Sequence, residues 1–234
     1  MRKKYFGLST AWILIVLGVV GLFGCLSVVV TDIVGTLAVK GYNPITQTIS
    51  SLAITDRAWI QDVGLNLFSA SFAACGAGFL ILDLGKLRWK IGSILLLLLA
   101  VDILVISEYD TYADADSFGS TVHLACTVIL GGLFILAPWL TAFGLKHIGR
   151  RYYLYSLATA GFWGAFSFVF FLIPTNWDGA YERFLSLIVI AWVMIASWLL
   201  VGQGRQRLRS TPSVNNAPDI VKKLEYRGHK APDS

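Results

Sequence analysis

Six runs of apolar residues constrain this chain more than any other feature of its sequence. A helix needs about 20 apolar residues to cross the hydrocarbon core of a bilayer, and an open sheet cannot satisfy its backbone hydrogen bonds in lipid. The pattern therefore predicts an all-α, polytopic transmembrane helix bundle with six spans. The predicted spans are Ala11–Val30, Val63–Leu82, Ile91–Ile106, Val122–Leu145, Tyr152–Ile173 and Phe184–Val201.

Composition points to the same class of protein. Of the 234 residues, 56% are hydrophobic and only 14% are charged, whereas soluble domains average about 25% charged residues. These values exclude a disordered chain, a secreted disulfide scaffold and an ordinary cytosolic enzyme. The net charge of +5 comes from short cationic clusters between apolar runs, so we expect membrane lipids as partners and no nucleic acid. The sequence leaves the oligomeric state open.

The distribution of cations predicts the orientation. Sixteen of the 19 Lys and Arg residues lie in the two termini and in the second and fourth linkers, and only Lys40, Arg57 and Arg183 lie on the other side. Because cytoplasmic loops carry the excess of positive charge, we expect both termini in the cytoplasm and the protein in the plasma membrane.

The C-terminal region changes character after the last span. We predict a transmembrane domain over residues 1–202 and a basic cytoplasmic tail over residues 203–234. Gly202–Arg209 is expected to extend the last helix, and the polar, proline-containing remainder is expected to be disordered.

A lipoprotein signal is the main alternative reading of the N-terminus. Leu22–Cys25 resembles a cleavage site that precedes a lipid-modified cysteine. The bulky Phe23 and the continuation of the apolar run to Val30 favour an uncleaved first span.

The loop after the first span carries its own helical pattern. Asn43 followed by Pro44 is typical of a helix start, and Ile45, Ile49 and Leu52 then recur at helical spacing. This pattern predicts an amphipathic external helix between the first two spans.

Polar side chains gather where the spans end on the external side. Asp102 is the most costly of them, since an ionisable group at membrane depth costs about 2.5–3.5 kcal/mol and needs a partner or a wet cavity. The hairpin of spans three and four brings Asp102 near His123, and Arg183 is the cation placed to pair with Asp102 or Glu108. We expect a polar, outward-facing ligand pocket, although an ion pair that only clamps helix ends explains the same residues. The candidate ligand-binding residues are Ser50, Ser51, Asn66, Asp102, His123, Glu182 and Arg183.

Several chemical classes can be weighed against these residues. A membrane zinc hydrolase needs several histidines at one site, and the chain has three in all, of which only His123 lies externally. The acidic loop after Glu108 lacks a calcium-loop spacing, so we expect no metal and no cofactor. A serine hydrolase can be built from Ser50 or Ser51 with His123 and Asp102, but no Gly-x-Ser-x-Gly motif supports it.

These motifs resemble a known family. The run Tyr42–Ala53, then Trp59, Asn66, His123 and Gly179–Arg183, is similar to the signature of the membrane family called domain of unknown function 998. The resemblance implies six spans and no assigned activity. Members of that family often carry an acidic residue and a glycine where this chain has Ser51 and Ala53.

The sequence therefore favours a non-enzymatic multi-pass membrane protein whose external pocket binds a lipid headgroup or a small polar ligand. A membrane-embedded hydrolase or transferase acting at the outer leaflet is the alternative. A small-solute transporter ranks lower, because transporters usually bind substrate near the midplane.

Overall fold

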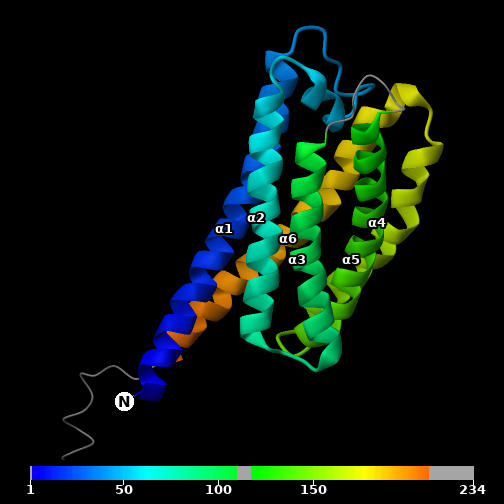
Figure 1. Ribbon diagram of the computed structural model, residues 1–234. Coiled ribbons are helices and arrows are strands. Elements are labelled where there is room, and N and C mark those ends of the chain that lie inside the picture. Colours follow the sequence, from blue (N-terminus) through cyan, green and yellow to red (C-terminus); the bar gives the residue numbers. More distant parts are fainter. Residues whose placement is uncertain (1, 110–116, 211–234) are drawn as a thin grey trace, which may run out of the picture.

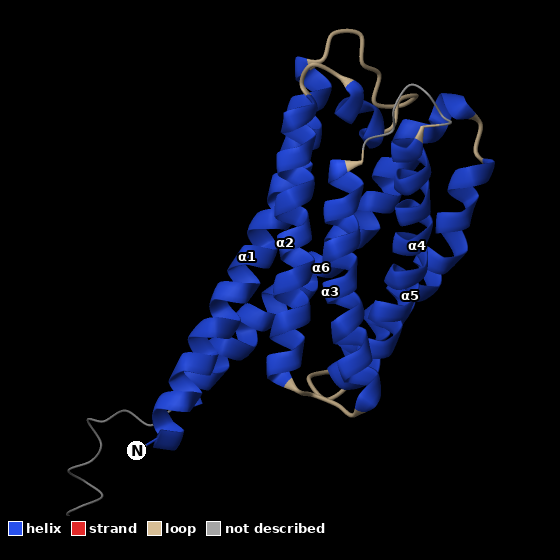
Figure 2. Cartoon of the chain, in the orientation of Figure 1, coloured by secondary structure: helices blue, strands red, loops and turns tan. Residues whose placement is uncertain are grey.

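The fold is a bundle of six long α-helices. The computed structural model describes residues 2–109 and 117–210, with side chains from residue 8 onward, and within those ranges it contains helices and loops but no strand (Figure 2). The α-helices are α1 (Arg2–Ala38), α2 (Ala58–Leu82), α3 (Leu87–Glu108), α4 (Phe118–Leu145), α5 (Arg150–Phe166) and α6 (Asp178–Ser210). Short 3-10 helices are η1 (Ile49–Ile54), η2 (Ser167–Leu172) and η3 (Thr175–Trp177).

The six predicted spans are confirmed. Six helical segments among the described residues are long and apolar enough to cross a membrane, so the protein is an integral membrane protein. Most helices extend beyond the predicted bounds, because polar residues at the ends of an apolar run continue the same helix. The last helix is an example, since it continues through Arg209 and ends at Ser210; the rest of the predicted tail, 211–234, lies outside the described residues.

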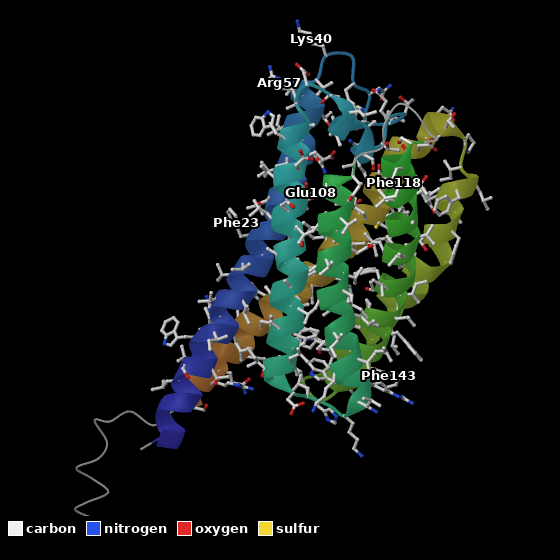
Figure 3. The ribbon with its side chains drawn as sticks, in the orientation of Figure 1. Phe23, Lys40, Arg57, Glu108, Phe118 and Phe143 are labelled. Carbon is white, nitrogen blue, oxygen red and sulfur yellow. The ribbon has the colours of Figure 1, made fainter. Side chains whose placement is uncertain are left out.

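The helices pack in chain order around the bundle. Each of α1 to α5 packs on the next helix, and α6 returns to lie along α1 and also contacts α2 (Figure 1). We call the end that carries the long connections around η1 and η3 the loop end, and the end that carries the short connections α2–α3 and α4–α5 the turn end. Figure 3 shows Lys40 and Arg57 at the loop end and Phe143 towards the turn end.

Close backbone approach holds α1 against its two neighbours. A Cβ atom at Gly18 would meet the Ser197 carbonyl oxygen of α6 at 2.6 Å. A Cβ atom at Gly24 would clash with the Leu67 carbonyl oxygen and the Ser71 hydroxyl of α2. Small residues at these positions let the helices pack without a hydrophobic driving force between them in lipid.

Aromatic rings fill the middle of the bundle. Phe79 stacks on Trp89 with ring centroids 4.7 Å apart, and Phe134 packs edge-on against Trp163 and Trp192. The indole N–H groups are satisfied in this apolar setting, for example by the Phe79 carbonyl oxygen 2.7 Å from Trp89 Nε1. The middle of the bundle is therefore closely packed and mainly apolar, and the polar candidate site lies at the loop end.

The fifth span departs from the predicted single helix over Tyr152–Ile173. The α-helix ends at Phe166 and is followed by the 3-10 turn η2. Pro174 comes directly after Ile173, whose backbone is extended (φ −73°, ψ 143°). A residue before proline is driven out of the α-region, so the span changes geometry before it reaches the proline.

Replacing Gly24 by alanine is expected to destabilise the protein by about 1–3 kcal/mol, because α1 must move away from α2 to fit a methyl group. The matched control is Gly161→Ala, which places its methyl group in open space. Thermal unfolding in detergent measures the effect. A Gly24→Ala protein as stable as the Gly161→Ala control contradicts the observed α1–α2 contact.

Candidate functional site

The predicted external helix is wrong in its type. Asn43 does not cap a helix: its side-chain Oδ1 accepts a hydrogen bond from the Ile45 N–H at 3.0 Å within a turn, and the N-cap of the helix that follows is Thr48. The chain then makes a turn and enters only the 3-10 helix η1. The cause is tertiary: the Ile45 carbonyl accepts a bond from Ala180 N–H, and the Pro44 carbonyl accepts one from Arg183. Those carbonyls are therefore taken by α6 and cannot propagate an α-helix.

Arg183 is the centre of this attachment. Its Nε and Nη2 donate to the two carboxylate oxygens of Asp32 on α1 at 3.0 and 2.8 Å. Its Nη1 lies within 3.2 Å of the carbonyl oxygens of Pro44, Gln47 and Gly179. All three guanidinium nitrogens therefore bind α1, the loop or α6. The sequence predicts Arg183 beside Asp102 or Glu108, and this prediction is wrong, because the carboxylate that pairs with Arg183 is that of Asp32.

Tyr42 completes the clamp. Arg183 Nη2 donates to the Tyr42 hydroxyl at 2.8 Å, and that hydroxyl donates to the Thr48 carbonyl at 2.7 Å. Burial raises the pKa of the Tyr42 hydroxyl, and the hydrogen bond from Arg183 acts in the opposite direction. The phenol therefore stays protonated at neutral pH and can donate to the loop.

Gly179 allows the loop to reach α6. A Cβ atom at this position would clash with the carbonyl oxygens of Gln47 and Pro44. Only glycine leaves room for the loop backbone at the first turn of α6. We call Asp32, Tyr42, Gly179 and Arg183 the loop clamp.

The loop clamp brings three predicted site residues together. Ser50 Oγ lies 3.2 Å from His123 Nε2 and 3.4 Å from Glu182 Oε1. The other Glu182 carboxylate oxygen accepts a hydrogen bond from the Ile49 N–H. We call Ser50, His123 and Glu182 the polar triad; it is assembled from η1, α4 and α6.

The tautomer of His123 follows from its second partner. Its Nδ1 lies 2.9 Å from the carbonyl oxygen of Tyr109 at the end of α3. A carbonyl can only accept, so Nδ1 carries the proton. In the neutral ring Nε2 is therefore an acceptor, and it faces the Ser50 hydroxyl.

The other predicted site residues lie elsewhere. Ser51 donates to the Thr48 carbonyl at 2.6 Å, within its own turn. Asn66 Oδ1 accepts a hydrogen bond from Ser107 at 3.0 Å, across the α2–α3 contact. The Asp102 carboxyl makes a hydrogen bond with the Cys126 thiol of α4. Cys126 lies about one helical turn after His123 in the chain. These three residues do not join the polar triad.

Two buried side chains in the loop-end half carry polar atoms that have no hydrogen-bond partner among the described residues. Gln61 is 1% exposed, and neither polar atom of its amide has a hydrogen bond within the described part of the chain. Asp102 is 8% exposed, and its Oδ2 is likewise unpartnered there. Such groups are rarely left bare in a folded protein.

Sequence reasoning missed Asp32, Tyr42 and Gln61 as contributors to this region. Gln61 had a readable signal, because it lies seven residues before Phe68 and therefore on the core-facing side of α2. Asp32 had none, since its partner is 151 residues away in the chain.

Among the described residues, no group of three or more His, Cys, Asp or Glu side chains is placed to hold a metal ion. The polar triad offers an imidazole, a hydroxyl and a carboxylate, which together can bind polar groups and exchange a proton.

Comparison with known proteins gives one match. The model of a family described as "Protein of unknown function (DUF998)" matches residues 19–199, a range that contains the loop clamp and the polar triad. Neither the curated proteins nor the solved structures yield a match.

Replacing Arg183 by glutamine is expected to destabilise the loop end, because Asp32 then loses its partner. Both side chains are about one-fifth exposed, so the cost should approach, without reaching, the about 3–5 kcal/mol seen when a fully buried pair is broken. Thermal unfolding and proteolysis of residues 42–55 measure the loss. Arg57→Gln is the control, since its ion pair with Asp56 is largely exposed and should contribute under about 1 kcal/mol. Equal stability of the two variants would refute the clamp.

Proposed function

This chain belongs to the DUF998 family, and from that premise we propose that its loop end faces the outside of the plasma membrane and binds a lipid headgroup or a small polar ligand at the polar triad. The observation that carries this proposal is the convergence of Ser50, His123 and Glu182 from three separate elements. All three side chains are only partly buried, so a ligand can reach them from the surface.

The charges at the site favour a cationic or polyhydroxyl ligand. Arg183 forms its bidentate ion pair with Asp32. Glu182 therefore has no ion-pair partner among the described residues. A carboxylate placed between an N–H donor and a hydroxyl keeps lone pairs for an ammonium or for hydroxyl groups. An anionic headgroup would be repelled by the same carboxylate.

The buried polar groups support a ligand or water beneath the triad. Gln61 and Asp102 both lie on core-facing positions of their helices, and each has atoms that no described residue satisfies. Unpaired buried polar groups cost about 1–3 kcal/mol each. A polar ligand or a water molecule bound at the loop end is the simplest source of hydrogen-bond partners for these atoms.

The aromatic core argues against a conduit. Phe79, Trp89, Phe134 and Trp192 pack against one another within the bundle and are almost completely buried. A transport path from the polar triad to the turn end would have to pass these rings, so binding at one face is favoured over transport.

Orientation can be tested with introduced cysteines. Lys40→Cys at the loop end is expected to react with a membrane-impermeant maleimide in intact cells. Lys86→Cys at the turn end should react only after permeabilisation, because the cationic turn end is expected in the cytoplasm. The native cysteines Cys25, Cys75 and Cys126 are buried and serve as the negative control. The reverse labelling pattern contradicts the proposed topology.

Ligand binding can be tested on protein purified gently from its host membrane. Native mass spectrometry is expected to find retained lipids with zwitterionic or polyhydroxyl headgroups. Glu182→Gln should reduce that retention at least tenfold, since it removes the charge that selects the headgroup. The matched control is Glu108→Gln, an exposed carboxylate also at the loop end (Figure 3). Unchanged retention in a folded Glu182→Gln protein would mean that the triad only clamps helix ends.

A further inference from the structure

We propose that Ser50 is a nucleophile activated by His123, so that the polar triad cleaves a carboxylic ester presented by the membrane. This inference rests on the proposed function, because it takes the polar triad as the site at which a lipid headgroup region is bound. It goes beyond binding in assigning a reaction, a substrate class and a role to each member of the triad.

The Ser50–His123 contact has the arrangement that nucleophilic catalysis requires. A serine hydroxyl is a weak nucleophile unless a neighbouring base takes its proton. His123 Nε2 lies 3.2 Å from Ser50 Oγ, within the range expected of a base and nucleophile before substrate binds. Ser51, next in the chain, instead donates its hydroxyl to a backbone carbonyl, so only one of the two serines is placed to react.

The base is fixed in the productive tautomer. The Tyr109 carbonyl holds the proton on Nδ1, at 2.9 Å, and Nε2 is left bare towards Ser50. A backbone carbonyl here does the orienting that a buried carboxylate performs in the serine protease triad. The carbonyl comes from the C-cap of α3, so the α3–α4 hairpin sets the angle of the ring.

Glu182 is a positioning residue on the opposite side of the hydroxyl. One carboxylate oxygen accepts from Ile49 N–H. The other is a second acceptor for the single Ser50 hydroxyl proton at 3.4 Å, farther away than His123 Nε2 at 3.2 Å. The first contact fixes the residue before Ser50, so the carboxylate sets where η1 lies relative to α4.

The depth of the site selects the substrate class. Ser50 lies in the connection between two helices that are long and apolar enough to cross a membrane, so we place it at the membrane interface. At that level a bilayer presents the ester bonds that join acyl chains to headgroups. Beside α6, an apolar groove of about 330 Å³ is lined by residues that include Pro174, Trp177 and Phe184, at the same end of the bundle. The substrate class is therefore a carboxylic ester of a membrane lipid, and water is the acceptor.

The reaction balances with these groups alone. Ser50 Oγ bonds to the ester carbonyl carbon while its proton moves to His123 Nε2, and the bond to the alcohol oxygen breaks as that alcohol takes the proton. Water then attacks the acyl-serine, gives a proton to Nε2 and releases the carboxylic acid, and the proton returns to Ser50. The sum is ester plus water to alcohol plus acid.

A fluorophosphonate probe tests the nucleophile directly on the full-length protein in detergent. Ser50 Oγ is expected to bond to phosphorus and expel fluoride, and peptide mass spectrometry should place the label on Ser50 and not on Ser51. Ser50→Ala should abolish labelling, and Ser51→Ala should retain it. His123→Gln should slow labelling about a hundredfold or more, which is the contribution typical of a general base.

The outcomes separate this inference from the proposed function. Absent labelling of wild-type Ser50, or equal rates in wild type and a folded His123→Gln protein, overturns the nucleophile. If His123→Gln does not fold, the position of the label in wild type decides alone. Lipid retention measured on the same samples reports binding independently. Retained lipid without labelling of Ser50 overturns the nucleophile but supports the binding site. Absence of both lipid and labelling overturns the nucleophile and the binding site together.

Discussion

The guanidinium of Arg183 is the constraint on which the loop end depends. A largely buried arginine must find acceptors for its N–H groups, and this one binds Asp32 of α1 together with carbonyls of the first long loop. Satisfying that single side chain draws the loop down onto α6 and joins α6 to α1. The loop held in this position carries Ser50, whose hydroxyl contacts both His123 and Glu182.

Apolar and polar side chains occupy different levels along the length of the bundle. Aromatic rings with satisfied indole N–H groups fill the interior, and the buried polar atoms of Gln61 and of Asp102 Oδ2, which have no hydrogen-bond partner among the described residues, lie in the loop-end half. In lipid, unsatisfied polar groups are costly, so a site for polar chemistry is placed where water and headgroups are within reach. The polar triad therefore lies at the loop end, next to a closely packed aromatic interior.

Hydropathy predicted the spans because it is a local property of the chain. The external α-helix was mispredicted because Asn43, Pro44 and the apolar spacing report only local conformational preference. In the structure, two backbone carbonyls of that segment accept hydrogen bonds from α6. Depth in the membrane placed His123 and Glu182 at the same end of the bundle, where both contact Ser50, but it could not distinguish Asp32 from Asp102 as the partner of Arg183. That choice depends on how the loop folds, which no single-sequence pattern encodes. The candidates Asn66 and Ser51 failed to join the triad for the same reason.

The proposed site requires that the Ser50 hydroxyl contacts both His123 and Glu182 while the loop clamp holds the loop on α6. An experimental structure in nanodiscs made from the host membrane tests this most directly. We expect the Ser50 hydroxyl within hydrogen-bond distance of His123 Nε2, with density for a headgroup or acyl ester above it. A structure in which Arg183 has left Asp32, the loop has moved from α6 and His123 faces only solvent would contradict the account.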